Sequence, residues 1–321
     1  MLIRRFFLFF LFVGLPTALF ADIKPGDLPA MSKWYFHVDF EEMREAEGGR
    51  HLYTWLQGEV FEDVREDAGV DLDKEANQIT AFAAGDDGLI VVVDGNISQE
   101  TRDKIMGMGA ATGAMDRMES AGKTYYYIKN DGHDQGSEED DAAEYAEHYQ
   151  HEDHGFEIDG LDDGAYFSFA LKNKAIVTSA EADMQAMLAN NGRVPRSDIG
   201  DGALLVLSAD KSLIQAGLNT DDFEHGSGWD SNIINNTEQL ALLVADEAGK
   251  IAIQAQLVTS KQEMAESLAS IVRGLISLQV FNDDMDPEIS EFLQNTNVDV
   301  DGSTLTIKVA LDPEVVIAAI E

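Results

Sequence analysis

Stretches in which apolar and polar residues alternate recur along this chain, usually in pairs with a short turn between them. Residues 250–257 are one such stretch, and a period of two is typical of a β-strand with one buried face. A turn as short as Glu247-Ala248-Gly249 allows only antiparallel pairing, because parallel strands need a long crossover. Segments with helical spacing separate the pairs. The chain is therefore predicted to have an α+β fold, with antiparallel sheets covered on one face by helices.

The order of these expected elements repeats along the chain. Residues 34–191 and 203–321 each read strand, helix, hairpin, long helix, two further strands and a last helix. The best local match sets Leu89–Val93 and its following helix against Ile251–Ala255 and its following helix, although the residues themselves differ. This order predicts an internal duplication of a strand-helix-hairpin-helix-strand unit; the alternative is a chance agreement of alternating elements. Residues 192–202, which contain proline and glycine, are the expected linker between the halves.

Three helices have a predicted start. Thr178 with Glu181 and Ser260 with Glu263 match the capping box, in which a hydroxyl and a carboxylate bond to free backbone N–H groups. Pro313 suits the first position of the last helix, because its missing N–H would be unpaired there in any case.

A further predicted helix, from Ser98 to about Ser120, is rich in methionine and glycine. Methionine side chains adapt to varied partners, so this helix is a candidate binding surface. The alternative is a weakly formed helix that packs tightly on its own sheet. The residues concerned are Met106, Gly107, Met108, Gly109, Gly113, Met115 and Met118.

The first 21 residues predict export. Arg4 and Arg5 precede an apolar run from Phe6 to Leu15, and the segment ends in Ala21, which together are typical of a secretory signal peptide. The run is too short for a transmembrane helix, which takes about 20 residues; the alternative is an uncleaved anchor. We therefore expect a signal peptide over residues 1–21 and a leader over residues 22–33. The mature protein would be periplasmic or extracellular, without stable membrane insertion.

The composition excludes several classes of function. With 60 acidic and 22 basic residues, the net charge is −38, which repels nucleic acid. An envelope protein or a cation is the expected partner. The chain has no cysteine, which excludes disulfides, thiol catalysis and cysteine-ligated metal centres.

An acidic insertion over residues 130–164 carries four of the seven histidines. If the segment is helical, side chains three and four residues apart share a face, which groups two histidines with one glutamate. Neutral imidazole and carboxylate groups suit Zn²⁺, Ni²⁺ or Cu²⁺. The alternative is a solvated acidic loop whose histidines bind nothing. The candidate ligands are Glu144, Glu147, His148, His151 and His154, and no other cofactor is implied.

Catalytic motifs are missing from the sequence. There is no G-x-S-x-G nucleophile elbow, and Gly122-Lys123-Thr124 lacks the first glycine of a phosphate-binding loop, since Arg117 stands there. Alternate carboxylates in Asp71-Leu72-Asp73 and Asp299-Val300-Asp301 do not continue into a calcium loop. We therefore expect a non-catalytic binding protein of the cell envelope. The first alternative is a divalent-metal-binding or buffering protein, and the second is an enzyme with a convergent site. A binding protein should expose a sizeable apolar patch.

Overall fold

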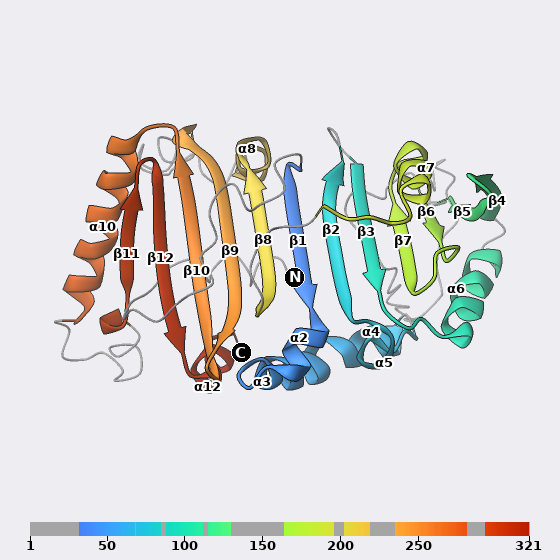
Figure 1. The fold of residues 1–321 in the computed structure, drawn as a ribbon, viewed down its shortest axis with the longest axis horizontal. Helices are drawn as coiled ribbons and strands as arrows, with labels where there is room; N and C mark the ends of the chain where they lie inside the picture. Colours follow the sequence, from blue (N-terminus) through green and yellow to red (C-terminus); the bar gives the residue numbers. More distant parts are fainter. Residues whose placement is uncertain are drawn as a thin grey trace, which may run out of the picture.

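Twelve strands from both halves of the chain form one antiparallel sheet in the computed structural model of the protein (Figure 1). The structure describes residues 32–67, 69–84, 88–111, 115–129, 164–195, 202–218, 235–280 and 293–320. The strands are β1 (Trp34–Asp39), β2 (Gln78–Ala84), β3 (Gly88–Asp94), β4 (Met115–Ser120), β5 (Lys123–Ile128), β6 (Ala165–Ser168), β7 (Lys174–Thr178), β8 (Ala203–Asp210), β9 (Thr237–Glu247), β10 (Lys250–Thr259), β11 (Asn297–Asp301) and β12 (Thr304–Leu311). The predicted α+β class is confirmed, but the strands form a single sheet where several were expected.

The strands β1 and β8 lie side by side in the middle of the sheet and join its two arms. Outwards from this pair, one arm runs β1, β2, β3, β7, β6, β5, β4, and the other runs β8, β9, β10, β12, β11. In each arm the central strand is followed by a hairpin, and a later strand returns to pair with the second strand of that hairpin. The first arm is longer by the β4–β5 hairpin.

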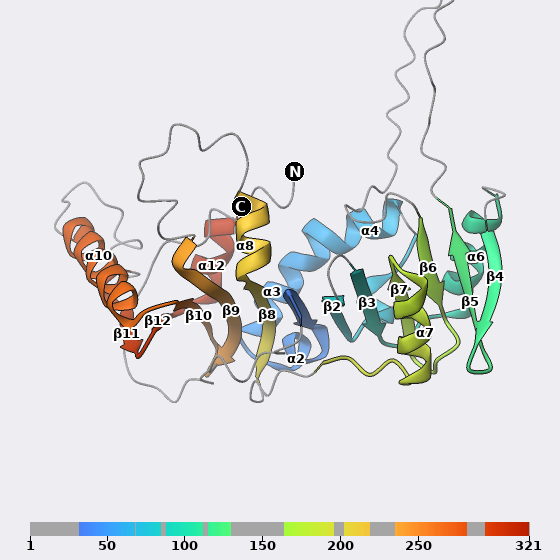
Figure 2. The same cartoon turned by 90° about the horizontal axis from the view of Figure 1, so that it is seen from above.

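Helices cover both faces of the sheet, rather than the one face expected from the sequence. We call the face that carries α7 the front, since it is nearer the viewer in Figure 1, and the opposite face the back. Figure 2 shows α3, α4, α8, α10 and α12 on the back of the sheet. The helices are α2 (Phe40–Glu45), α3 (Gly49–Leu56), α4 (Glu62–Asp67), α5 (Leu72–Glu75), α6 (Gln99–Ala111), α7 (Glu181–Ala189), α8 (Lys211–Leu218), α10 (Gln262–Val280) and α12 (Pro313–Ile320), and the π-helical turn η3 (Gln57–Phe61) joins α3 to α4.

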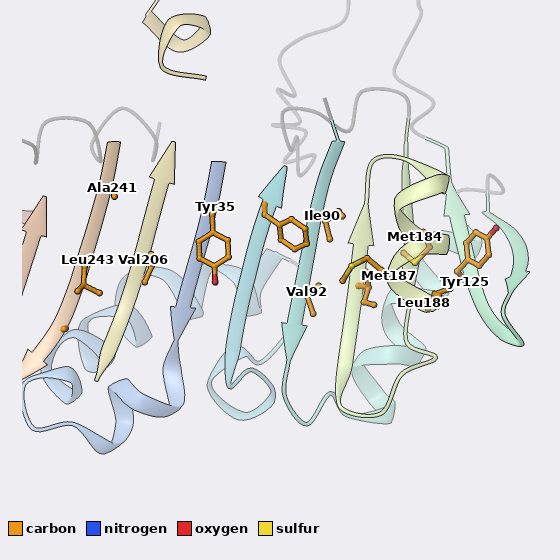
Figure 3. Packing of buried hydrophobic residues seen from close by; sticks show 13 residues of the cluster. Tyr35, Ile90, Val92, Tyr125, Met184, Met187, Leu188, Val206, Ala241 and Leu243 are labelled. Carbon is orange, nitrogen blue, oxygen red and sulfur yellow. The ribbon is translucent and has the colours of Figure 1, made fainter. Parts of the chain in front are cut away.

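The front core centres on α7. Met184 and Leu188 of this helix have no exposed surface, and they pack in one cluster with Ile176 of β7 and Tyr125 of β5 (Figure 3). The cluster continues along the sheet to Val206 of β8. Strands from both arms therefore contribute to a single front core.

The back of the sheet has two separate clusters. In the first, the rings of Phe40, Tyr53 and Phe61 meet edge to face with centroids 5.1 to 6.3 Å apart, and pin α2, α3 and η3 against the lower ends of the central strands. In the second, Ala265 and Ala269 let α10 lie close over β11 and β12.

The predicted helix from Ser98 to Ser120 is wrong in its second half. The helix α6 ends at Ala111, and Met115–Ser120 form β4, which pairs with β5. A two-residue turn closes this hairpin, with Ala121 and Gly122 at φ values of 51° and 70°. Both residues of a type I′ turn need positive φ, which this Ala-Gly pair supplies without the usual asparagine signal.

The two capping boxes also differ from expectation. α7 begins at Glu181 with Ala180 at its N-cap, and the Thr178 hydroxyl donates to the Ala180 carbonyl oxygen at 2.8 Å. The Ser260 hydroxyl donates to Asn236 Oδ1 at 3.0 Å, one residue further from the start of α10 than a cap would be. Neither hydroxyl caps its helix: Thr178 bonds a carbonyl two residues along the same segment, and Ser260 bonds Asn236, just before β9. The predicted start of α12 at Pro313 is confirmed.

Candidate functional site

An unbroken row of apolar side chains crosses the back of the sheet. Residues that face each other on neighbouring antiparallel strands point to the same side, so the strand registers trace the row directly. Phe36 on β1 faces Leu207 on β8 and Ala81 on β2. We call this the apolar row; from β12 to β7 it comprises Ile307, Ala255, Leu242, Leu207, Phe36, Ala81, Val91 and Val177. At about 4.8 Å per strand, these eight strands span about 34 Å.

Each residue of the apolar row is only half-buried. The parallel row on the front, one residue along each strand, is more completely buried: Ser208, Tyr35 and Thr178 in it are 5%, 2% and 0% exposed. Polar and apolar members of the front row are thus covered alike, while the apolar row on the back stays partly exposed. The back therefore carries apolar surface that the fold leaves partly open.

The helices on the back stand around the apolar row. In Figure 1, α10 lies at the far left, α12, α2, α3, α4 and α5 along the lower edge, α6 at the right and α8 at the top. The lower neighbouring row, which includes Val38, Ile79 and Val309, belongs to the cluster that the lower helices cover. The apolar row therefore borders this cover. Phe36 packs against the lower cluster and Ile307 against the cluster under α10, while the other six residues of the row belong to neither cluster.

A polar network fastens the lower helices beside the row. Arg44 of α2 donates to Tyr53 Oη and to Asn77 Oδ1, both at 2.9 Å, and its guanidinium lies 5.2 Å from the centre of the Tyr53 ring. The Tyr53 hydroxyl donates to Asp73 Oδ1 at 2.6 Å, and Gln57 Nε2 donates to the same oxygen at 2.9 Å. Burial, and then the hydrogen bond to Asp73, raise the pKa of Tyr53. The network holds α2, α3 and α5 in fixed relation.

A second network fastens α7 on the front. The Tyr125 hydroxyl donates to Glu181 Oε1 at 2.7 Å, and Gln185 Nε2 donates to that oxygen at 2.8 Å. The hydrogen bond to Glu181, together with burial, raises the pKa of Tyr125. Lys123 Nζ donates to the Leu188 carbonyl oxygen at the end of α7 at 2.5 Å. These bonds anchor both ends of α7 on β5.

The predicted metal ligands Glu144, Glu147, His148, His151 and His154 lie outside the described residues. Within the described ranges, no group of three or more histidine and carboxylate side chains is placed to hold a metal ion. Of the carboxylates considered for calcium, Asp71 caps α5 by accepting from the Lys74 N–H, and Asp301 ends the β11 strand at a tight turn.

The methionine surface predicted on one helix is divided between two elements. Met106 lies on α6, whereas Met115 and Met118 lie on β4, and Met118 packs against the front core. A Cβ atom at Gly109 would lie 2.9 Å from Ile128 Cδ1, so α6 lies tightly on its own sheet. This is the packing alternative considered for that helix.

Sequence reasoning missed the apolar row, although a signal for it exists. In β9 the residues Leu240 to Ala245 form a continuous apolar run instead of an alternating one. Such a run is typical of a strand with apolar neighbours on both faces. It identifies a sheet with two apolar faces, but only the strand registers show that the side chains line up across eight strands.

Comparison with known proteins gives a distant likeness in fold. No protein-family model matches the chain, and no curated protein matches it. Solved structures of TP0453 are similar in overall course: crystal form IV with a TM-score of 0.44 and 12% identity over 94% of this chain and 97% of that one, and crystal form III with a TM-score of 0.43 and 12% identity over 94% and 98%. None of the described helices is both long and apolar enough to span a membrane.

Proposed function

We propose that the protein is an exported, non-catalytic binding protein of the cell envelope, and that its apolar row receives an amphipathic helix of a protein partner. The observation that carries this proposal is the half-burial of eight aligned apolar residues on a face framed by helices. Contiguous apolar surface of this kind typically marks an interaction site. The signal-like residues 1–21 support export, and they agree with a working place in the periplasm or the medium.

A helix is the occupant that this face accommodates best. Wherever described residues bury the back of the sheet, the cover is helical: α10 lies over β11 and β12, and α12 packs against the strands beside the apolar row. Those helices present alanine, valine, leucine and isoleucine, which match the aliphatic side chains of the row. The row itself carries no charged side chain, so affinity would come from apolar contact. The net charge of −38 favours a partner whose polar face is neutral or basic.

The same proposal includes an internal duplication of the α+β unit. The order β1, β2, β3, β7, β6 in one arm corresponds to β8, β9, β10, β12, β11 in the other. Helices α6 and α10 follow the corresponding hairpins, and α7 and α12 follow the returning strands. In this view the β4–β5 hairpin and the acidic insertion are additions to the first copy.

The direct test measures binding of two synthetic helical peptides to the mature chain. One peptide is amphipathic and contains leucine, alanine, glutamine and serine; the other has the same composition in scrambled order. We expect the amphipathic peptide to bind with micromolar affinity and the scrambled peptide to bind at least about tenfold more weakly, measured by fluorescence anisotropy.

Three variants locate the site. Leu207→Asp places a charge at the centre of the row and should abolish binding of the amphipathic peptide, whereas Leu207→Thr should weaken it with little effect on folding. Leu213→Asp is the matched control, because Leu213 is 39% exposed on α8 and lies outside the row. Equal binding of both peptides, or unchanged binding by a folded Leu207→Thr protein, would refute the helix-binding function. Binding of a short alkyl glucoside in place of either peptide would point to a small aliphatic ligand and would also refute it.

A further inference from the structure

The C-terminal half of α10 has an exposed apolar face that the apolar row does not explain. Leu278 is 72% exposed and Leu275 is 43% exposed, while Ile271 is half-buried. The buried side of the helix is different: Ala265, Ala269 and their neighbours pack on the sheet. The helix therefore has two apolar faces, of which one has no cover among the described residues.

The spacing of the uncovered face is that of a helix–helix contact. Ser267, Ile271, Gly274 and Leu278 recur at intervals of four, three and four residues, with Leu275 between them. This 4-3-4 spacing keeps side chains along one line of a helix and suits a second helix packed against it. We call these five residues the outer face of α10.

Gly274 gives independent support for a helix packed against the outer face of α10. Glycine inside a helix lowers stability relative to alanine, so it usually answers a packing need. At Gly274 an added Cβ atom would meet nothing within 4 Å, so the protein's own fold does not require glycine there. Ser270 and Ser277 lie beside it, and their hydroxyls donate to the Glu266 and Arg273 carbonyl oxygens at 2.8 Å. The result is a small, internally bonded surface that lets another backbone approach closely.

We propose that the outer face of α10 pairs antiparallel with the same face of a second copy of this chain, with the two helices crossing at Gly274. In that arrangement Ile271 of one copy lies beside Leu278 of the other, and Ser270 lies beside Ser277. Apolar groups thus meet apolar groups, and small residues meet small residues. A surface that complements itself in this way is what a two-fold interface requires.

The charges on the outer face of α10 permit a second copy as the occupant. Two chains of net charge −38 repel each other, so they associate only where charge is sparse and the bulk of each molecule stays apart. Of the residues from 267 to 278 only Arg273 is charged, in a chain with 26% charged residues, and its Nη2 donates to the Val298 carbonyl oxygen of its own chain. In Figure 1, α10 lies at one end of the long axis, so pairing there keeps the two molecules end to end. The proposal is independent of ligand binding at the apolar row.

The chain has no cysteine, so single thiols can report the contact directly. Gly274→Cys should form a covalent dimer under mild oxidation, because the two Cα atoms at a crossing point come within disulfide reach. A mixture of Ser270→Cys and Ser277→Cys should yield mainly the mixed dimer, which only an antiparallel pair gives. Glu266→Cys is the matched control: it is also exposed on α10, but in an antiparallel pair that crosses at Gly274 its two copies lie eight residues from the crossing point on opposite sides of it, so it should stay monomeric.

Sedimentation of the mature chain measures the same contact without a cross-link. We expect a dimer at about 100 µM that dissociates on dilution and strengthens with salt, and at least a tenfold weaker association for Leu278→Glu. A monomer at all concentrations, or cross-linking of Glu266→Cys as efficient as that of Gly274→Cys, would overturn the proposal. The proposal would also fail if the chain were monomeric and the Leu278→Glu variant unfolded at a lower midpoint, because a segment of the same chain would then occupy the face.

Discussion

Neighbouring rows of side chains on the two faces of the central sheet are covered to different degrees. On the front, the row that contains Ser208, Tyr35 and Ile90 is covered almost completely. On the back, the apolar row is unbroken from β12 to β7, and each of its residues stays partly exposed. Since the faces alternate along the same strands, strand propensity cannot explain the difference. The layer on top differs as well: α7 is fastened over β6 and β7 on the front, while the described back helices stand around the apolar row.

This difference in cover separates residues that stabilise the fold from residues that remain available for binding. A fully covered face adds to the stability of the isolated chain, whereas half-exposed apolar groups gain their remaining burial only when something else covers them. The front core and the two back clusters jointly hold the fold together. The apolar row on the back keeps apolar contact area available for an occupant.

Adjacent leucines of β9 test the contrast most sharply. Leu243 points to the front and is 2% exposed, while Leu242 points to the back and is half-buried. We expect Leu243→Ala to lower the free energy of unfolding by about 3 kcal/mol and Leu242→Ala by about 1 kcal/mol, because only the first leaves a closed cavity. Urea titration followed by circular dichroism measures both. Equal losses would mean that the back is as well packed as the front.

The elements of the fold could be predicted from the sequence more fully than the apolar row on the back of the sheet. The element order and most strands could be predicted from alternation and turns, since these are local signals. The Ala121-Gly122 turn was missed because alanine rarely adopts positive φ, so nothing in the sequence separated α6 from β4. The apolar row could not be predicted at all: it depends on the strand order, which brings Leu207 beside Phe36 although more than 160 residues separate them.

Removing Arg44 should loosen the cover beside the apolar row without touching the front. Arg44→Met deletes the donors to Tyr53 and Asn77 but keeps the length of the side chain. We expect a loss of about 2 kcal/mol in unfolding free energy, because partners in a half-buried network lose their hydrogen bonds. Hydrogen exchange should accelerate in α2 and α3, while protection in α7 stays unchanged. Faster exchange in α7 as well would show that the two covers are coupled.

The stability of the protein at high pH should depend on one buried tyrosine beside each helical cover, Tyr125 on the front and Tyr53 on the back. The pKa of Tyr125 is raised by its hydrogen bond to Glu181 and by burial, so its neutral form is favoured in the fold. That contribution is fully present below the unfolded pKa of about 10 and is lost as pH rises through the higher folded value. Tyr125→Phe should therefore flatten the decline in stability above pH 10, and Tyr53→Phe should do the same for the back cover. Thermal melts from pH 8 to about pH 11 compare them; a slope unchanged in both variants would contradict the assignment.

The smallest expected effect is a change in stability at two hairpin turns, which lie outside both faces of the sheet and serve as a reference for the larger effects. The β9–β10 hairpin closes through Ala248 and Gly249 at φ values of 51° and 86°, much as Ala121 and Gly122 close the β4–β5 hairpin. Alanine is strained at positive φ, whereas asparagine tolerates it and is preferred in type I′ turns. Ala248→Asn and Ala121→Asn should each raise the unfolding free energy by about 0.5 kcal/mol, and their effects should add because the turns belong to different arms of the sheet. Neither change alters an apolar contact, so peptide binding should remain at the wild-type level. A gain in stability accompanied by weaker binding would mean that the back of the sheet binds by deforming, and that its half-open state reflects flexibility instead of an unfilled contact surface.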